Sequence, residues 1–410
     1  MSKWMTRVGV AMLLAGAAAV SYAAPRHWTT SWISPAEPAW SSDFVLPLGM
    51  PPLLRNVTMR QFLRVSLGGD RVRVVVSNEY GDAPLKVGAV HVGLASSARG
   101  LGATFQGARE VIVAAGATAV SDPIALPVAA GARLQIDVYL PQRSQLAGFH
   151  WDARDETLML HGNAAGRPSR DGAEKFAARA FLSAVLVESA QEPVTVVALG
   201  DSITDGNGSS PGADHRWPDF LARRLERRGV AVLNAGISGN RLLRAGMGDS
   251  ALARLDRDVL QHAGVRALIV MIGTNDIGWP GGPFAPDERP PNAAEITAGL
   301  HQLAERARVR GVRVVAGTLP PFEDALKGTP LEGHSSPQKE SVRQAVNDWI
   351  RHSGAFDAVV DFDRLLRDPS RPTRLRAEFD SGDHLHPGDA GYRAMADAVD
   401  LDDLLGASGQ

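Results

Sequence analysis

The second half of the chain alternates short apolar runs with longer amphipathic segments, and this pattern constrains the fold more than any other feature. The apolar runs indicate buried strands, and the segments between them place their apolar residues on one side of a helix. The strands are expected at 194–199, 230–233, 267–272, 312–317 and 358–362. Repeated alternation of strand and helix is typical of a parallel sheet with helices on both faces. In such sheets, ligands bind at the carboxyl ends of the strands.

The first half lacks the helical pattern and consists of short alternating runs. Residues 61–67 and 71–76 flank Gly68-Gly69-Asp70, which predicts a β-hairpin. Further runs, separated by Gly, Pro, Asp and Asn, occur at 87–94, 110–114, 133–140 and 157–160. Many short strands at this spacing favour a β-sandwich of jelly-roll type. We therefore expect a β-sandwich accessory domain at 24–190 and an α/β domain at 191–410.

The N-terminus has the pattern of a secretory signal peptide. Lys3 and Arg7 precede an apolar stretch at 8–20, and Ser21-Tyr22-Ala23 places small residues where a signal peptidase cleaves. The stretch is short for a transmembrane helix, although an uncleaved anchor is the alternative interpretation. We expect residues 1–23 to be removed and the mature protein to be secreted or periplasmic in a bacterium, without stable membrane insertion.

Charge and composition narrow the range of functions. The chain has 410 residues, with 43 Lys and Arg against 45 Asp and Glu, so it lacks the basic surface that nucleic-acid binding usually needs. It contains no Cys, which excludes disulfides, thiolate metal sites and a cysteine nucleophile. Most of its 11 histidines are scattered, without the spacing of a metal site. Neither a metal nor a cofactor is expected, and the sequence does not indicate an oligomeric state.

Short polar motifs follow the strands of the predicted sheet. They are Gly200-Asp201-Ser202, Gly239, Gly273-Thr274-Asn275-Asp276 and, in a C-terminal turn, Asp383-His384-Leu385-His386. Each has a purely structural explanation when it is taken alone, because Ser, Asp and Asn cap helices and Gly forms turns. Together they are expected at one edge of the sheet, where the strands end.

The combined motifs contain the parts of a serine hydrolase. Ser202 is the predicted nucleophile, His386 the base that takes its proton, and Asp383 the carboxylate that orients His386. The backbone N–H groups of Ser202 and Gly239 and the side-chain amide of Asn275 are the predicted oxyanion hole.

Neighbouring residues offer competing assignments. His384 lies only one residue from Asp383, and the D-x-x-H spacing favours His386 as the base. The segment 208–212 matches the G-x-S-x-G pattern of α/β-hydrolases, but it lies in a polar loop rather than between a strand and a helix. Ser210 is therefore not expected to be the nucleophile.

The motifs, in this order, resemble the SGNH (GDSL) hydrolase family, whose name lists its four signature residues. Their counterparts here are Ser202, Gly239, Asn275 and His386. The resemblance covers about 194–405. It implies a flavodoxin-like three-layer α/β/α domain and ester hydrolysis that needs no metal or cofactor.

Two further stretches are similar to a narrower branch of this family. Residues 197–206, followed by Arg216-Trp217-Pro218, resemble the XynE-like arylesterase/acylhydrolase branch associated with xylanolytic bacteria. Residues 59–81 are similar to the β-rich region that often precedes this branch. The resemblance implies a secreted serine esterase that hydrolyses short, mainly acetyl, esters of a small-molecule or polysaccharide substrate from carbohydrate or plant material.

Other functions fit parts of the same pattern. One is a lysophospholipase or arylesterase acting on lipid or aryl esters, and another is a carbohydrate-binding protein with a vestigial hydrolase half. Trp279 and Phe284, in a proline-rich loop at 278–292, are candidates for the substrate pocket. Asp201 and Asp276 are more simply explained as residues that fix turns by hydrogen bonds.

Overall fold

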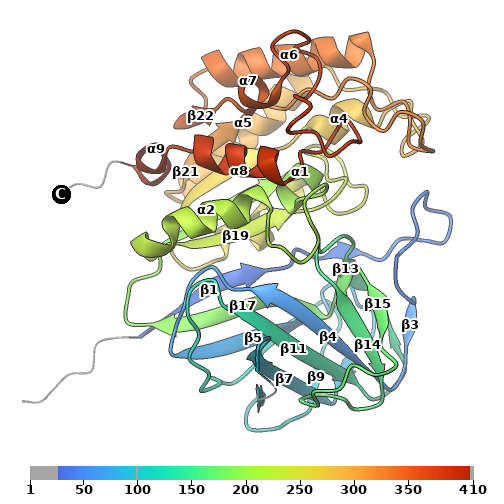
Figure 1. Cartoon of the computed structure of the whole chain (residues 1–410), viewed down its shortest axis with the longest axis vertical. Coiled ribbons are helices and arrows are strands. Elements are labelled where there is room, and N and C mark those ends of the chain that lie inside the picture. Colours follow the sequence, from blue (N-terminus) through green and yellow to red (C-terminus); the bar gives the residue numbers. More distant parts are fainter. Residues whose placement is uncertain (1–25, 98–99, 407–410) are drawn as a thin grey trace, which may run out of the picture.

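The computed structural model describes residues 26–97 and 100–406. The expected signal peptide, 1–23, lies outside this described part. A β-rich half and an α/β half lie one above the other along the long axis of the molecule (Figure 1). Within the described residues, none of the helices has the length and apolar character needed to cross a bilayer.

Two antiparallel sheets form most of the first half and enclose one buried apolar core. The four-stranded sheet has the order β1 (His27–Ile33), β17 (Leu182–Ser189), β5 (Arg71–Ser77) and β10 (Thr118–Val120). The six-stranded sheet has the order β15 (Glu174–Phe176), β14 (Thr157–His161), β4 (Val57–Arg64), β11 (Arg133–Leu140), β7 (Ala89–Leu94) and β8 (Gly100–Gly102). In β5, β7 and β11, alternate residues belong to this core, as the two-residue period of a strand requires.

Short strands complete this half. One sheet joins β2 (Glu37–Pro38), β13 (Gly148–His150) and β16 (Arg179–Ala180). The remaining pairs are β3 (Leu53–Leu54) with β12 (Ser144–Gln145), and β6 (Leu85–Val87) with β9 (Val111–Val113).

The predicted hairpin is wrong. β4 pairs with β11 and β14, whereas β5 pairs with β17 and β10, so the two strands lie in different sheets. The chain crosses between the sheets at Gly68 and Gly69, where a Cβ on Gly69 would lie 2.6 Å from the carbonyl oxygen of Glu188. Two alternating runs joined by turn residues are compatible with a hairpin. They are equally compatible with two strands that lie in opposite sheets and face the same core.

The second half contains a five-stranded parallel sheet. Its order is β19 (Ala231–Gly236), β18 (Thr195–Gly200), β20 (Val265–Met271), β21 (Arg313–Gly317) and β22 (Ala358–Val360). The first strand in sequence lies between the second and the third, which is the doubly wound order of flavodoxin-like folds. The expected α/β fold, preceded by a β-rich region, is confirmed.

Helices connect and cover these strands. The longer ones are α2 (Trp217–Leu225), α5 (Ala293–Val309), α6 (Pro337–His352) and α8 (Asp389–Ala398). The shorter ones are α1 (Ser202–Asp205), α3 (Ala251–Leu255), α4 (Thr274–Gly278), α7 (Phe362–Leu366) and α9 (Leu401–Leu405), with a 3-10 turn at Glu226–Arg228 and a π-helical turn at Asp256–Leu260. α2 packs beside α8, and α5 packs beside α6 (Figure 1).

The two halves share an extensive boundary. β1 runs next to β19, the edge strand of the parallel sheet. Buried Trp40 donates from Nε1 to the carbonyl oxygen of Met247 at 2.8 Å, and Val232 N donates to Ser66 Oγ at 3.1 Å. Met247 and Trp279, from loops of the α/β half, belong to the apolar core of the β-rich half. The loops that follow β19 and β20 are therefore held against the first half.

Candidate active site

Ser202 is positioned by the end of a fully buried strand. β18 ends at Gly200, and the single helical turn α1 begins at Ser202. Asp201 caps this turn by accepting a hydrogen bond from Ile203 N at 3.0 Å. The turn ends at Gly206, whose φ of 111° lies in the region that favours glycine. Ser202 is buried, with 7% of its surface exposed.

The C-terminal turn brings a histidine and an aspartate to this serine. His386 Nε2 lies 2.8 Å from Ser202 Oγ, and His386 Nδ1 lies 2.6 Å from Asp383 Oδ2. The other carboxylate oxygen of Asp383 accepts from the backbone N–H groups of Leu385 and His386 at 2.9 and 2.8 Å. A carboxylate only accepts, so Nδ1 carries the ring proton and Nε2 is left to accept from the serine.

The charge state of Asp383 suits this arrangement. Burial opposes ionisation of Asp383, but hydrogen bonds and charge from His386 hold the pKa of this carboxyl well below its ordinary value. An ionised Asp383 favours the His386 tautomer with its proton on Nδ1, and it would stabilise an imidazolium if the ring took up a second proton.

The competing residues point elsewhere. His384 has a φ of 60°, and its Nδ1 lies 2.5 Å from Asp380 Oδ2, with 44% of its side chain exposed. This agrees with the expectation that His384 faces away from the serine. Ser210 Oγ donates to Asp389 Oδ2 at 2.7 Å in an exposed setting.

Of the three predicted oxyanion donors, the backbone N–H of Ser202 lies after β18, and the other two, from Gly239 and Asn275, lie after β19 and β20. Asn275, in the first turn of α4, is 4% exposed and donates from Nδ2 to the carbonyl oxygen of Asn240 at 3.0 Å. An amide nitrogen has two hydrogens, so one stays available for a ligand. Gly239 has a φ of 68°, and a Cβ there would lie 2.2 Å from Met247 Sδ. The positive φ and this close approach both favour glycine at the position.

Asn275→Ala is expected to lower kcat by about 100- to 1000-fold, the typical effect of losing one oxyanion donor. KM is expected to change little, because the negative charge develops only in the transition state. Steady-state kinetics with p-nitrophenyl acetate measure both constants. A variant with unchanged kcat would show that Asn275 only secures the Asn240 carbonyl.

Asp201 and Asp276 fix the surrounding turns, as expected. Asp276 accepts from Leu242 N at 2.7 Å and from Leu243 N at 3.0 Å, which ties the loop after β19 to α4. Burial raises the pKa of Asp201 to about 7 and that of Asp276 to about 6. Oδ2 of Asp201 is buried and has no hydrogen-bond partner within the described chain.

The pKa of Asp201 predicts a pH-dependent cost in stability. Its folded-state pKa of about 7 exceeds the ordinary value for Asp of about 4, so the folded state holds a proton that the unfolded state has lost between these values. Protonated Asp201 therefore favours the folded state. Its contribution to the free energy of unfolding is complete below about pH 4 and is lost as the pH rises through 7.

Asp201→Asn keeps the acceptor for Ile203 N and removes the buried charge. We expect the free energy of unfolding of the variant, relative to the original protein, to increase from pH 5 to pH 7 and then level off, by a few kcal/mol in total. Urea unfolding at pH 5, 6, 7 and 8 measures this difference. A difference independent of pH would contradict it.

Two histidines for which the sequence indicated no role lie near this site. His334 is 4% exposed, and its pKa is lowered to about 3 by burial, with further contributions from Lys339 and His386. His150, in β13, contacts Asp205 of α1. No spacing in the sequence connects either residue with the motifs, because both come from distant elements.

The aromatic candidates pack together. The rings of Trp279 and Phe284 are stacked with centroids 4.4 Å apart, and Trp279 is 3% exposed. A Cβ on Gly239 would lie 2.8 Å from the Trp279 ring, so this ring supports the Gly239 turn. That the pair also lines the substrate pocket stays a prediction. Across the described ranges, no cluster of three or more His, Asp or Glu side chains is arranged to hold a metal ion.

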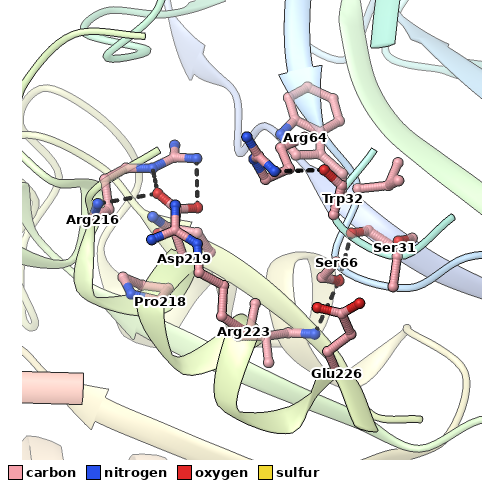
Figure 2. Close-up of a pocket in the computed structure, with 15 residues that line it drawn as sticks. Ser31, Trp32, Arg64, Ser66, Arg216, Pro218, Asp219, Arg223 and Glu226 are labelled. Carbon is pink, nitrogen blue, oxygen red and sulfur yellow. Dashed lines mark hydrogen bonds and ion pairs between the residues drawn. The ribbon is translucent and has the colours of Figure 1, made fainter. Parts of the chain in front are cut away.

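A separate cavity of about 290 Å³ lies between the β-rich half and α2 (Figure 2). None of the motif residues lines it. Its guanidinium groups are already paired: Arg64 with Asp214 at 2.7 Å, and Arg216 with Asp219 at 2.7 Å. Arg223 donates to the carbonyl oxygen of Asp214 at 2.8 Å. The cavity therefore offers no unpaired guanidinium to a ligand.

Comparisons with known proteins concern the α/β half. Residues 198–394 match the sequence model of the GDSL-like Lipase/Acylhydrolase family. The chain is similar to a GDSL-like lipase from Bacteroides thetaiotaomicron, with 19% identity over 51% of this chain and 88% of that chain and a TM-score of 0.38. It is also similar to the acetyl xylan esterase AlAXEase, with 18% identity over 50% and 97% of the two chains and a TM-score of 0.36. No curated protein sequence matches the chain.

Proposed function

We propose, from the match of residues 198–394 to the GDSL-like Lipase/Acylhydrolase family model, that this protein is an ester hydrolase. Its proposed nucleophile is Ser202, with His386 as the base and Asp383 as the carboxylate that orients it. The observation that carries the proposal is the continuous hydrogen-bonded series from Ser202 Oγ to His386 and from His386 to Asp383, at 2.8 and 2.6 Å.

The same contacts support a two-step reaction. His386 Nε2 takes the proton of Ser202 as Oγ bonds to the ester carbonyl carbon, and the carbonyl oxygen becomes an oxyanion. The proton then passes to the alcohol oxygen as the bond between carbon and alcohol breaks, which leaves an acyl group on Ser202. Water attacks this acyl-enzyme with His386 as base, and the acid and the free serine are released.

The N–H groups of Ser202 and Gly239 and the amide of Asn275 are proposed to bind the oxyanion in both steps. One such donor contributes roughly 3 to 4 kcal/mol to the transition state. No charged side chain is required for this role.

Short acyl groups, mainly acetyl, on carbohydrate or plant-derived alcohols are the proposed substrates. The resemblance of the motifs to the XynE-like arylesterase/acylhydrolase branch supports a short acyl group. The resemblance of 197–206 and 216–218 to the XynE-like branch supports the choice of alcohol. We also propose export through the signal peptide at 1–23, on its charge and apolar pattern.

A substrate series tests this proposal. Acid release is measured with p-nitrophenyl acetate, butyrate and octanoate, with acetylated xylan, and with a lysophospholipid, using hydrolysis in buffer without protein as the blank. We expect the acetate to be preferred among the aryl esters and acetylated xylan to be preferred over the lysophospholipid. Preference for the octanoate and the lysophospholipid would indicate a lipid hydrolase. No turnover above the blank would indicate a binding protein.

A further inference from the structure

The β-rich half places a buried histidine against the helical turn that carries Ser202. His150 ends β13 and is 6% exposed. Its Nε2 lies 2.9 Å from Oδ1 of Asp205, the last residue of α1, and its Nδ1 lies 2.9 Å from the carbonyl oxygen of Pro35. His150, from the β-rich half, thus contacts α1, the helical turn of the α/β half that begins with the predicted nucleophile.

The partners of His150 determine its charge. A carbonyl oxygen only accepts hydrogen bonds, so Nδ1 carries a proton, and the Asp205 carboxylate requires a second proton at Nε2. Burial alone would lower the pKa of His150, but the charge and hydrogen bond of Asp205, with smaller effects of Glu37 and Pro35, raise it to about 9. His150 and Asp205 therefore form a buried ion pair at neutral pH.

Other charged groups act on this pair from the surrounding elements. Glu37, on β2, is fully buried, and burial raises its pKa to about 8, so it is mostly neutral at pH 7. Arg254 interacts with Glu37, and Arg216 interacts with Asp205. Only His150 contacts the Asp205 carboxylate as an ion-pair partner within hydrogen-bond distance in the described part of the chain.

The second oxygen of Asp205 reaches the loop that holds Gly239. Ser238 Oγ donates to Asp205 Oδ2 at 2.8 Å, and Ser238 directly precedes Gly239. The backbone N–H of Asp205 donates to the carbonyl oxygen of Asp201 at 2.9 Å. Asp205 therefore connects the turn of the predicted nucleophile with the turn that carries a predicted oxyanion donor.

We propose that His150 is a positioning residue of the esterase: by pairing with Asp205 it holds α1 and the Ser238-Gly239 turn in the relative placement that the transition state requires. The proposal rests on the proposed function. It makes the β-rich half part of the catalytic apparatus, because without His150 a buried Asp205 carboxylate would keep only the Ser238 hydroxyl as a side-chain donor.

His150→Ala tests this directly in the full-length protein. A shift of about 1 Å in a catalytic group can cost about 100-fold in rate, so we expect kcat for p-nitrophenyl acetate to fall by about 10- to 100-fold. KM should stay within about threefold. His150→Gln should recover most of the loss, because its amide can donate to Asp205.

Tyr80→Phe is the matched control. Tyr80 also joins the two halves, with its hydroxyl 2.6 Å from Asp249 Oδ2, and the other hydrogen bonds of this hydroxyl go to Ala36 and Arg257 rather than to α1. Loss of the Tyr80 hydroxyl should lower the melting temperature and leave kcat within about twofold of the original protein. An equal loss of kcat in Tyr80→Phe and His150→Ala would overturn the proposal, since any weakening of the boundary would then suffice.

Asp205→Asn and the double variant Asp205→Asn/His150→Ala complete the test. The double variant has no unpaired buried carboxylate, so it can still be measured if His150→Ala alone does not fold. If the two side chains act through each other, the double variant should lose no more kcat than Asp205→Asn alone. Losses that multiply would overturn the proposal. An inactive original protein would reject the proposed function itself, whereas an active protein with unaffected His150 variants would reject only this inference.

Discussion

Ser202→Ala is expected to reduce ester hydrolysis by about four to six orders of magnitude, because the residues of such a catalytic group act as a unit. The fold should be retained, since the serine hydroxyl contacts one side chain, His386, at 2.8 Å. Steady-state turnover of p-nitrophenyl acetate gives the activity, and thermal unfolding gives the stability.

Ser210→Ala is the matched control, because Ser210 occupies the competing G-x-S-x-G segment eight positions along the chain. It should keep nearly all activity, since its hydroxyl is bonded to Asp389 rather than to the histidine of the site. An inactive Ser210→Ala with an active Ser202→Ala would move the nucleophile to the other motif.

His386→Ala is expected to lower activity about as much as Ser202→Ala, whereas His384→Ala should stay within a few-fold of the original protein. The two residues are separated by one position, but only His386 contacts both Ser202 and Asp383. His384 contacts Asp380 instead. The value of kcat/KM for the two variants measures the contrast, and the reverse result would assign the base to His384.

Asp383→Asn extends the same comparison. The amide would keep the shape of the side chain but would no longer hold His386 in the required tautomer, so a loss of about 10⁴-fold in kcat is expected. Activity close to that of the original protein would show that the backbone of the turn orients His386 without the carboxylate.

The parallel sheet was predictable because its strands contain short, nearly continuous apolar runs. β18 is buried at every position, and such a run between turn residues has few other interpretations. In the first half, β5 and β11 alternate in part between buried and half-buried positions, whereas β4 is buried at seven of its eight positions. Neither pattern shows which strand is the neighbour. The wrong hairpin at β4 and β5 follows from this difference, because pairing depends on the rest of the sheet.

Some residues of the candidate site could be predicted from local sequence patterns, and others could not. Asp383 and His386 are close in sequence, and Ser202 and Asn275 follow strands that end at one edge, so local patterns place all four together. His150 and Asp205 are separated by 55 positions and come from different halves. Their contact depends on how the β-rich half is packed against β19, which no local pattern contains.

Covalent labelling tests the central claim most directly. The protein is incubated with a serine-directed phosphonate ester, digested, and the modified residue is identified by mass spectrometry. We expect a single modification at Ser202, lost in His386→Ala and retained in His384→Ala, because the nucleophile needs the neighbouring base for activation. Modification at Ser210 would contradict the account, as would a protein that hydrolyses esters while Ser202 stays unmodified.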